Sequence, residues 1–532
     1  MTESIAVYSA LNEHVLQTYP ITSQTDIREQ ITAARSAAKT WAAYSVAQRI
    51  ALLSALKTVI LEDIDAITDT IMTVTGKVKT EVLLGEVYPV LELLRYYEKN
   101  AVRILKPCHL STSPLAFPNA KAQFERRPYG VVAIISPWNF PFQLTLSPLL
   151  TALFSGNAVL FKTSELSIPI GELITQLFNR IGLPIGLVQH IIGDAKTGEH
   201  LIDSRPDLVF FTGGIHAGRA IMARAAQHPI PVILELGGKD AMLVFDDANL
   251  TRACNAALYG AFSNSGQVCV SVERLYVQDS IYAQFVERLS DATSKLTVGH
   301  GAVGDLGALT SLAQYKTVEA HYQDALAKGA KASAPLQLNG RYLQPVVLWD
   351  VTHDMLIMQE ETFGALLPVM AFNTEQQAID FANDSDYGLN ASVWSRDITK
   401  AERIARQLQV GNWAVNDVIK NIGHAGLPFG GVKNSGFGRY HGAEGLRNFT
   451  YTVSGLTSRS ALNDEPNWFP YSDVRYQQMR GFIDFVFGNG SFWQRTRRNW
   501  QALQAFRGYA QSNARQHWEN FLIFVCRSFN PH

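Results

Sequence analysis

The sequence predicts an α/β protein made of two doubly wound domains, with a small hairpin and a helical C-terminal extension. Short continuous apolar runs alternate with helical patterns from about residue 131, and the alternation restarts after residue 234. Buried parallel strands separated by helices are typical of doubly wound sheets. A length of 532 residues is also too great for one ordinary core, so two or more domains are expected.

The first third of the chain is predicted to be mostly helical. Apolar residues recur at helical spacing over 27–61, and Asp26 is the expected cap of the first helix. A second helical segment is expected over 83–105. Pro89 should either kink this helix or mark a late start.

Buried strands are expected after residue 130. Val131-Val132-Ala133-Ile134-Ile135 is a continuous apolar run, which is typical of a strand inside a parallel sheet. Helical patterns separate it from later runs, so the sequence favours βαβ units. The expected strands are 131–135, 158–161, 187–192 (weakened by a polar middle), 208–211 and 232–234, with helices at 170–181 and 218–226.

The same alternation restarts near Glu235 and indicates a second α/β domain. No internal repeat or low-complexity tract interrupts it. The expected helices of this domain are 253–262, 281–289 and 376–383, and its expected strands are 274–277 and 391–394.

The composition is that of a soluble globular protein. Hydrophobic residues make up 47% of the chain and charged residues 17%, which argues against global disorder. The formal net charge is -1. No global electrostatic field therefore favours nucleic acid or acidic substrates.

Cysteine usage and the N-terminal residues both favour a cytoplasmic location. The four cysteines form no CxxC pair, so no metal centre is expected, and so few cysteines in a long chain indicate a reducing compartment. Residues 1–20 lack the basic start and apolar core of a signal peptide. No run is long and apolar enough to span a bilayer.

The segment after about Ser454 is rich in aromatic residues and arginine, and Glu519 is its only acidic residue after Asp484. Basic residues mixed with aromatics can mark a segment that contacts a membrane surface. The alternative, which we favour slightly, is a helical extension that packs on the body or on a partner subunit.

Five short segments stand out, and their order along the chain matters. They are Pro137-Trp138-Asn139-Phe140-Pro141, Phe211-Thr212-Gly213-Gly214, Glu235-Leu236-Gly237-Gly238-Lys239, Gly266-Gln267-Val268-Cys269 and Glu360-Glu361-Thr362-Phe363-Gly364. Any one of them alone is a weak signal. Together they resemble the aldehyde dehydrogenase superfamily, over about 21–452. The segment 436–440 and the long tail resemble its fatty-aldehyde and coniferyl-aldehyde branch, whereas 269–277 resembles semialdehyde dehydrogenases.

Cys269 is the candidate nucleophile. Attack on an aldehyde carbonyl needs a strong nucleophile that can later leave, and a thiolate supplies it. A free thiol has a pKa of roughly 8.5, so the site must favour its ionisation. A buried structural cysteine is the alternative, but Gly266 and Gln267 indicate a tight functional turn before it. We assign the structural role to the other three cysteines, Cys108, Cys254 and Cys526.

Asn139 and Glu235 complete the expected catalytic set. The side-chain amide of Asn139 would hold the oxyanion formed by attack, together with the backbone N–H of Cys269. Glu235 would act as general base for the water that hydrolyses a thioester on Cys269. Gly237 and Gly238 would let backbone or cofactor approach closely. Taken alone, Asn139 could serve only a turn and Glu235 only an ion pair; beside Cys269 the functional roles are favoured.

The resemblance also implies a Rossmann-like site for a nicotinamide dinucleotide, although no GxGxxG is present. Lys162 and Glu165 would address the adenosine ribose, and this Glu would repel a 2′-phosphate, so NAD is favoured over NADP. Thr212, Gly213 and the helix N-terminus that follows would face the pyrophosphate. Glu361 would bind the nicotinamide ribose. The full set of expected cofactor contacts is Trp138, Lys162, Glu165, Thr212, Gly213, Gly214, Gly218, Glu361 and Phe363.

The resemblance further implies an organisation and an oligomer. The chain is expected to comprise a dinucleotide-binding domain over 1–234, a catalytic domain over 235–422, a returning and oligomerisation segment over 423–454, and a basic aromatic extension over 455–532. A bridging hairpin at 108–127 is expected to take part in a homodimer contact.

The expected reaction is oxidation of an aldehyde to a carboxylic acid through a thioester on Cys269, with an apolar aliphatic or aromatic substrate. Three alternatives stay open at this point: a semialdehyde dehydrogenase, a coenzyme A-acylating enzyme and a non-catalytic scaffold. Glu235 argues against acylation of coenzyme A, where a base for water is superfluous. The intact set of Cys269, Glu235 and Asn139 argues against a scaffold.

Overall fold

The five strands expected between residues 131 and 235 join β19 in one six-stranded sheet in the computed structural model, in the order β19-β9-β8-β5-β6-β7. All but β19 run parallel, and β19 pairs antiparallel with β9. Every residue of three central strands is buried, which accounts for their continuous apolar runs. The strands are β5 (Val131–Ile135), β6 (Ala158–Lys162), β7 (Val188–His190), β8 (Leu208–Thr212), β9 (Val232–Glu235) and β19 (Gly436–Phe437).

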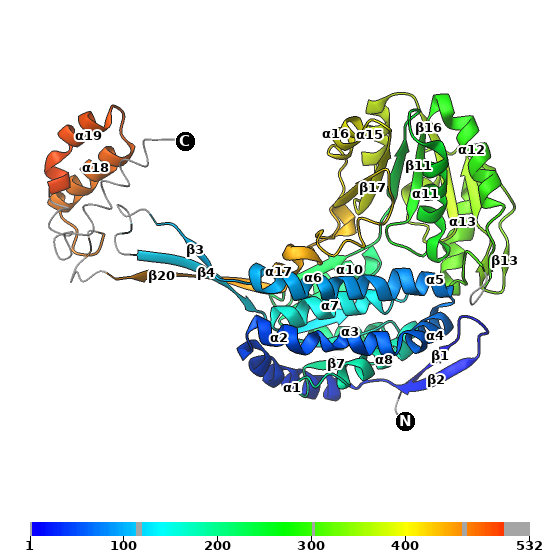
Figure 1. The fold of residues 1–532 in the computed structure, drawn as a ribbon, viewed down its shortest axis with the longest axis horizontal. Helices are drawn as coiled ribbons and strands as arrows, with labels where there is room; N and C mark the ends of the chain where they lie inside the picture. The colour runs from blue at the N-terminus through cyan, green and yellow to red at the C-terminus, as the bar shows by residue number, and fades with distance from the viewer. Residues whose placement is uncertain are drawn as a thin grey trace. The chain divides into compact units, whose positions relative to one another are not determined.

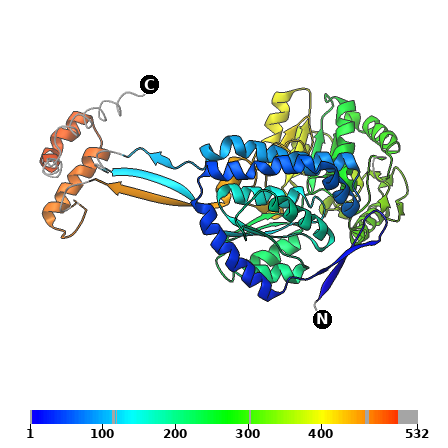
Figure 2. The same ribbon diagram turned by 60° about the horizontal axis from the view of Figure 1, so that its bottom comes forward.

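Helices cover this first sheet. Both α1 (Gln24–Ala43) and α7 (Gln143–Ser155) pack on β6, and α6 (Tyr88–Ile104) packs on α7 (Figures 1 and 2). Every residue of α7 is buried, so this helix is the centre of the core around the sheet. The other helices of this region are α2 (Val46–Leu53), α3 (Ala55–Glu62), α4 (Ile64–Thr75), α5 (Lys79–Val82), α8 (Ile168–Asn179), α9 (Ala195–Asp203), α10 (Ile215–Ala225) and α17 (Gly442–Asn448).

A second, seven-stranded sheet follows in the order β12-β15-β16-β11-β10-β17-β18. Its strands are parallel apart from β12, which pairs antiparallel with β15. The strands are β10 (Asp240–Val244), β11 (Val272–Gln278), β12 (Lys331–Ala332), β15 (Val346–Trp349), β16 (Leu366–Phe372), β17 (Asn390–Trp394) and β18 (Asn412–Val415). The helices around this sheet are α11 (Leu250–Phe262), α12 (Asp279–Thr293), α13 (Tyr315–Ala327), α14 (Leu356–Gln359), α15 (Glu375–Asn383) and α16 (Ile398–Ala405) (Figure 1).

These two parallel sheets, with the helical extension, confirm the predicted α/β class. Several strands were not expected from the sequence. The N-terminal hairpin is one case, because its second strand is largely exposed and carries little apolar alternation. The unexpected strands include β10, β12, β15, β16 and β18 of the second sheet, β19 of the first, and the pairs β1 (Ser4–Tyr8) with β2 (Val15–Pro20) and β13 (Leu338–Asn339) with β14 (Tyr342–Leu343).

Two details of the helical region differ from expectation. The first helix is capped by Ser23, whose side chain accepts a hydrogen bond from the backbone N–H of Asp26. The carboxylate of Asp26 in turn accepts a hydrogen bond from the backbone N–H of Ser23. Asp26 is therefore the N3 residue of a capping box and not the cap. A second capping box at Ser45 divides 27–61 into separate helices. Pro89 marks a late start, since α6 begins at Tyr88 after a π-helical turn over Leu83–Val87.

The chain divides into two compact units, one made of Met1–Lys106 with Arg126–Tyr451 and the other of Pro107–Glu125 with Thr452–His532. The structure describes residues 3–112, 117, 120–299, 304–459, 465 and 467–504. Several residues of the aromatic and arginine-rich C-terminal segment lie outside this part of the chain, namely Arg507, Arg515, Trp518, Glu519, Cys526 and Arg527.

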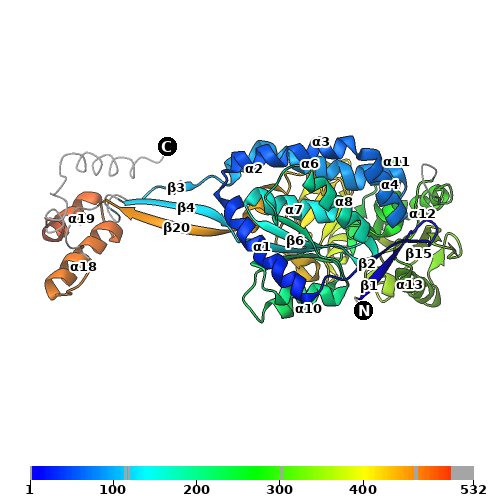
Figure 3. The same cartoon turned by 90° about the horizontal axis from the view of Figure 1, so that it is seen from below.

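Among its described residues, the second unit contains a three-stranded sheet and two helices. β4 (Ala120–Pro128) lies between β20 (Thr450–Ser458) and β3 (Cys108–Leu110), and it pairs antiparallel with β3 (Figure 3). The helices α18 (Asp473–Phe487) and α19 (Phe492–Arg498) contact one another, and Phe485 packs its ring 5.7 Å from that of Phe492. The predicted helical extension is thus present. The predicted homodimer stays a prediction.

Over the described residues, no single helix combines the length and apolar character needed to cross a bilayer. One bent pair, Gln24–Ala43 with Val46–Glu62, meets the criteria jointly, with an angle of 113° between its members.

Candidate active site

The carboxyl edge of the first sheet gathers most of the predicted site residues. Lys162 ends β6, Thr212 ends β8 and Glu235 ends β9, while Asn139 follows β5 by four residues. Because carboxyl ends of parallel strands meet at one edge, residues far apart in sequence share one region there. The amino end of β11 in the second sheet contributes Cys269 three residues before the strand begins.

Cys269 follows a strained turn. Gly266 has a φ of +76°, and a Cβ at this glycine would lie 2.3 Å from the backbone carbon of Gly364. The turn therefore requires glycine at this position. Cys269 is partly exposed and lies on the wall of a cavity. Burial, followed by the nearby carboxylates of Glu361, Asp240 and Glu235, raises the pKa of the Cys269 thiol.

Glu235 is a buried carboxyl group beside that thiol. Its exposed fraction is 3%, and neither carboxylate oxygen has a hydrogen-bond partner among the residues that the structure describes. Burial raises the pKa of Glu235 well above its usual value, and the positive charge of Arg439 offsets this only in part. Its backbone is fixed between β8 and β19, through pairing with Thr212 and Gly436. A carboxyl group that is held in place but lacks a partner can accept a proton from water.

Asn139 is also buried, with an exposed fraction of 3%. Its side-chain Nδ2 donates to the backbone carbonyl of Gln267 over 3.1 Å, two residues before Cys269. One N–H of the amide is thus used in a hydrogen bond to the turn before Cys269. This bond connects the segment after β5 to that turn. The backbone carbonyl of Asn139 accepts from Asn264 Nδ2 over 3.1 Å and from the ammonium group of Lys77.

Glu361 and Phe363 lie on a loop that a buried ion pair holds in place. Glu361 accepts from the backbone N–H of Gly238 over 3.0 Å, and burial raises the pKa of Glu361 to about 8. Phe363 has a φ of +52° and packs edge-on against Trp138 with ring centroids 5.5 Å apart. The carboxylate of Glu273 accepts from the N–H groups of Thr362 and Phe363 over 2.7 and 2.8 Å, and from Lys239 Nζ over 2.5 Å.

The edge of the first sheet fits a dinucleotide. Thr212 Oγ1 is buried without a partner in the described part of the chain, and Gly214 is the N-cap of α10 with open space beside its Cα. A helix N-terminus with free space can receive a phosphate group. Gly218 has a different position: a Cβ there would lie 2.6 Å from Leu236 Cδ2, so this glycine allows close packing of α10.

Lys162 and Glu165 lie at the end of β6. Lys162 is 3% exposed, and its Nζ donates to the carbonyl of Thr163 over 3.1 Å. Burial lowers the pKa of Lys162, while Glu165 and Asp194 act in the opposite direction. Glu165 is exposed and accepts from Ser164 Oγ over 3.3 Å. A buried cation and an exposed carboxylate at one strand end suit the hydroxyl groups of a ribose.

A cavity of about 1620 Å³ leads to Cys269. Small-molecule sites usually enclose roughly 300–1,000 Å³, so this cavity is larger than a short aldehyde requires. Its walls come from the segment that carries α5 and α6, from α7, from α11 and from the segment 417–426. Apolar side chains among them include Leu84, Tyr88, Phe140, Leu144, Tyr259 and Phe429.

Several residues of the site were missed by the sequence reasoning. Glu273 is part of Cys-Val-Ser-Val-Glu-Arg, and two adjacent charged residues, Glu273 and Arg274, in a largely apolar strand were a usable signal. Tyr440 is buried near Glu235 and Cys269, and burial, followed by the charges of these two groups, raises the pKa of its phenol. Lys77 and Glu86 gave no signal, because their pairing with the Asn139 segment depends on tertiary contacts.

The family model for the "Aldehyde dehydrogenase family" matches residues 1–454. The chain belongs to the aldehyde dehydrogenase family. The match covers both parallel sheets and every residue of the predicted catalytic and cofactor sets. The resemblance inferred from the five segments is therefore confirmed.

Individual members of the family are similar over most of their length. The chain is 61% identical over 520 residues to a 4,4'-diapolycopene aldehyde oxidase of Methylomonas sp, and the match covers 98% of each chain. It is 34% identical to a candidate NADP(+) succinate-semialdehyde dehydrogenase of Mycolicibacterium smegmatis, covering 85% of this chain and 88% of that one.

Solved structures of aldehyde dehydrogenases share the fold. One is betaine aldehyde dehydrogenase of Staphylococcus aureus in complex with NAD+, with 31% identity, a TM-score of 0.82 and coverage of 88% of this chain and 94% of that one. Another is an aldehyde dehydrogenase of Brucella melitensis biovar abortus 2308, with 31% identity, a TM-score of 0.82 and coverage of 86% and 94%.

Proposed function

We propose that this family member oxidises the aldehyde end of a long apolar polyene to a carboxylic acid, with NAD(P)+ as hydride acceptor. The observation that carries the proposal is the position of Cys269 on the wall of a cavity of about 1620 Å³ with largely apolar walls. The 61% identity to a 4,4'-diapolycopene aldehyde oxidase supports a carotenoid aldehyde as the substrate class.

The chain's residues have distinct roles in the proposed reaction. The thiolate of Cys269 attacks the carbonyl carbon, a C–S bond forms, and the carbonyl electrons move to oxygen. The N–H of Asn139 that does not bond Gln267 donates to this oxyanion, with the backbone N–H of Cys269. The bound dinucleotide supplies the acceptor for the hydride that leaves the same carbon. A thioester on Cys269 remains.

Hydrolysis of this thioester is the role proposed for Glu235. Its partnerless carboxylate takes a proton from water, the resulting hydroxide attacks the acyl carbon, and the C–S bond breaks. The acid leaves and Cys269 returns to the thiolate. Water is thus the acyl acceptor, which disfavours transfer to coenzyme A.

The cofactor is proposed to lie along the carboxyl edge of the first sheet. Lys162 and Glu165 would bind the adenosine ribose, Thr212, Gly213 and Gly214 the pyrophosphate, and Glu361 the nicotinamide ribose. Phe363 and Trp138, which pack edge-on, would form one wall of the cofactor site. The exposed Glu165 supports NAD, since its charge would repel a 2′-phosphate.

A semialdehyde is the second candidate substrate. The 34% identity to a candidate succinate-semialdehyde dehydrogenase favours it, and so do cations in the cavity wall that could bind a carboxylate. These cations are Arg95, Lys99, Arg252 and Lys420.

NADH formation followed by absorbance tests the proposal and separates the two candidates. The panel comprises a C30 polyene dialdehyde in detergent micelles, a long-chain fatty aldehyde, an aromatic aldehyde and succinic semialdehyde, each with wild type and Cys269→Ala. We expect the highest kcat/KM with the polyene and no turnover in the variant. A preference for succinic semialdehyde would replace the proposed substrate, and turnover by Cys269→Ala would overturn the covalent mechanism.

We propose that the second unit contacts an anionic membrane surface, from which such a substrate would be drawn. The tail after Ser454 carries nine arginines and five acidic residues, although the whole chain has a net charge of -1. Phe469, Phe487 and Trp493 are 78%, 80% and 77% exposed. Exposed aromatics beside cationic groups suit the headgroup region of anionic lipids.

Flotation with vesicles of phosphatidylglycerol and phosphatidylcholine tests this contact. The full chain should float with these vesicles at low salt and remain behind with pure phosphatidylcholine. The Phe487→Ser, Trp493→Ser double variant should bind less while keeping its activity on a water-soluble aldehyde. Equal flotation of both proteins would contradict a membrane role for these side chains.

A further inference from the structure

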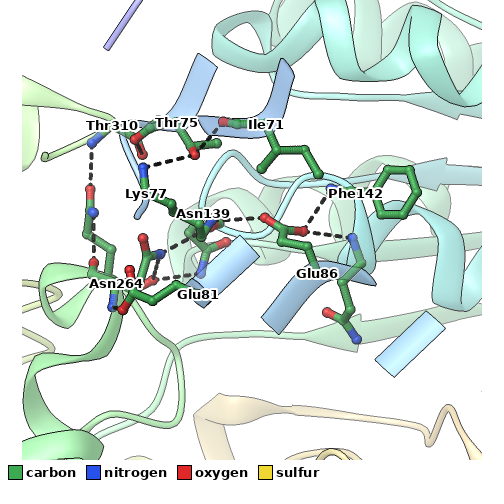
Figure 4. Close-up of polar contacts among 11 residues, drawn as sticks. Ile71, Thr75, Lys77, Glu81, Glu86, Asn139, Phe142, Asn264 and Thr310 are labelled. Carbon is green, nitrogen blue, oxygen red and sulfur yellow. Dashed lines mark hydrogen bonds and ion pairs between the residues drawn. The ribbon is translucent and has the colours of Figure 1, made fainter. Parts of the chain in front are cut away.

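The turn that carries Asn139 is held from both ends by a buried ion pair. Lys77 Nζ lies 2.9 Å from Glu86 Oε1, and both side chains are 0% exposed. The Lys77 ammonium also donates to the backbone carbonyl of Asn139 and lies 4.3 Å from the centre of the Phe140 ring. Figure 4 shows Lys77 and Glu86 meeting at this turn.

The other partner of the pair binds the opposite end of the same turn. Glu86 Oε2 accepts from the backbone N–H groups of Phe142 and Gln143 over 3.1 and 2.9 Å (Figure 4). These residues begin α7, where backbone N–H groups lack partners within the helix and a negative charge is favoured. One ion pair therefore fixes the carbonyl of Asn139 and the first amides of α7 together.

A second set of contacts joins this turn to the nucleophile segment. Asn264 Nδ2 donates to the carbonyls of both Asn139 and Gln267, each over 3.1 Å. The N–H of Asn264 in turn donates to Glu81 Oε1 over 2.6 Å. The carbonyl of Asn139 is thus a shared acceptor for Lys77 and Asn264, and a shift in either donor would move the amide group of Asn139.

We propose that Lys77 and Glu86 are positioning residues, which hold Asn139 where its side-chain amide meets the developing oxyanion. Neither touches the reacting atoms. The pair is buried, and a buried ion pair whose hydrogen bonds are formed allows its side chains few other conformations. Such a pair can therefore hold the Asn139 turn in one position. The inference rests on the proposed function, in which Asn139 donates to the oxyanion.

A second buried pair in the chain provides a matched control. Lys239 and Glu273 are 0% and 3% exposed, and Glu273 binds the N–H groups of Thr362 and Phe363 as Glu86 binds those of Phe142 and Gln143. This pair holds the Glu361 loop, which the proposed function assigns to the cofactor. Disturbing each pair should therefore affect a different step.

The test uses Glu86→Gln, which keeps a carbonyl acceptor for the α7 amides, and Lys239→Met as the control. We expect Glu86→Gln to lower kcat/KM for aldehyde by about 10- to 100-fold. The dissociation constant of NADH should change far less than kcat/KM, because Trp138 is the only proposed cofactor contact on the Asn139 turn. Lys239→Met should instead weaken NADH binding.

A double-mutant cycle separates positioning from general damage to the fold. In an Asn139→Ala background Glu86→Gln should have almost no further effect on kcat/KM, because the group it positions is gone. Lys77→Met is measured in the same cycle, with thermal unfolding to verify that each variant is folded. Full additivity of Glu86→Gln with Asn139→Ala, or wild-type kcat/KM for Glu86→Gln, would overturn this inference alone. Wild-type protein without turnover would overturn the proposed function as well.

Discussion

Gly238 lies directly against the backbone of Cys269: a Cβ at Gly238 would be 2.2 Å from the Cys269 carbonyl oxygen. The segment that starts at Glu235 and the segment that ends at Cys269 are therefore in contact through backbone atoms. Gly237 has a similar position, since its Cβ would lie 2.3 Å from Glu361 Oε2. The two glycines bring the candidate base, the nucleophile and Glu361 into one small volume.

Gly238→Ala should displace the Cys269 segment. A methyl group has no room there, so we expect a loss of about 1–3 kcal/mol in the free energy of unfolding and a fall in kcat. Chemical denaturation and NADH formation measure the two effects. Gly455→Ala is the control, because its Cβ would meet nothing within 4 Å. Unchanged kcat in Gly238→Ala would contradict the close contact.

Glu235→Gln should separate the two halves of the reaction. Acylation of Cys269 and the first hydride transfer need no base for water, so a rapid burst of NADH should remain. Steady-state turnover should fall by about 100- to 10,000-fold. Stopped-flow absorbance resolves the two phases, and loss of the burst together with turnover would assign Glu235 to an earlier step.

Wild-type turnover should increase with pH when hydrolysis of the thioester is rate-limiting. Glu235 acts as a base only when deprotonated, and burial raises its pKa well above the usual value. The deprotonated fraction therefore grows as pH rises through this elevated pKa, so the activity limb should lie above the ordinary Glu pKa of about 4.3. A turnover rate independent of pH down to about 5 would contradict the elevated pKa.

Alkylation of Cys269 by iodoacetamide should be slow at neutral pH without cofactor. Burial and three nearby carboxyl groups raise the pKa of this thiol, so the reactive thiolate becomes abundant only at alkaline pH. Burial raises the pKa of Glu361 to about 8, so Glu361→Gln should accelerate the reaction at alkaline pH, where the wild-type carboxylate is ionised. Mass spectrometry measures the labelling, with Cys269→Ala as the background. A maximal rate already reached at neutral pH would show that the thiolate is stabilised by other groups.

Glu165→Gln should shift cofactor preference toward NADP. The exposed carboxylate at the end of β6 would repel a 2′-phosphate, and the amide removes that charge while keeping the shape. We expect the ratio of kcat/KM for NADP to that for NAD to rise about tenfold, or about 1.4 kcal/mol. If this ratio of kcat/KM values did not change, the ribose 2′ position of the bound cofactor would not lie near Glu165.

The strands of the first sheet could be predicted because each is buried on both faces. Val131–Ile135 and Leu208–Thr212 give continuous apolar runs for this reason. Glu235 and Thr212 were identified from their short motifs, and the structure places each at the end of one of these strands. Ser23 escaped prediction as the helix cap because Asp26 is an equally good candidate by residue type, and only the observed capping box distinguishes them.

The supporting residues of the site could not be predicted in this way. Lys77 and Glu86 lie nine positions apart near a π-helical turn, and nothing local indicates that they meet at Asn139. Glu273 likewise depends on the approach of Thr362, which is distant in sequence. The residues proposed to touch substrate belong to short recognisable segments, whereas the residues that hold those segments depend on the packing of the whole domain.

The most direct test of the account is mass spectrometry of Glu235→Gln mixed with NAD and a polyene aldehyde. The account predicts an adduct with the mass of the acyl group on the peptide that contains Cys269, formed together with one equivalent of NADH and released by hydroxylamine. NADH formation without an adduct on Cys269, or an adduct on another residue, would contradict a thioester at Cys269 that Glu235 helps to hydrolyse.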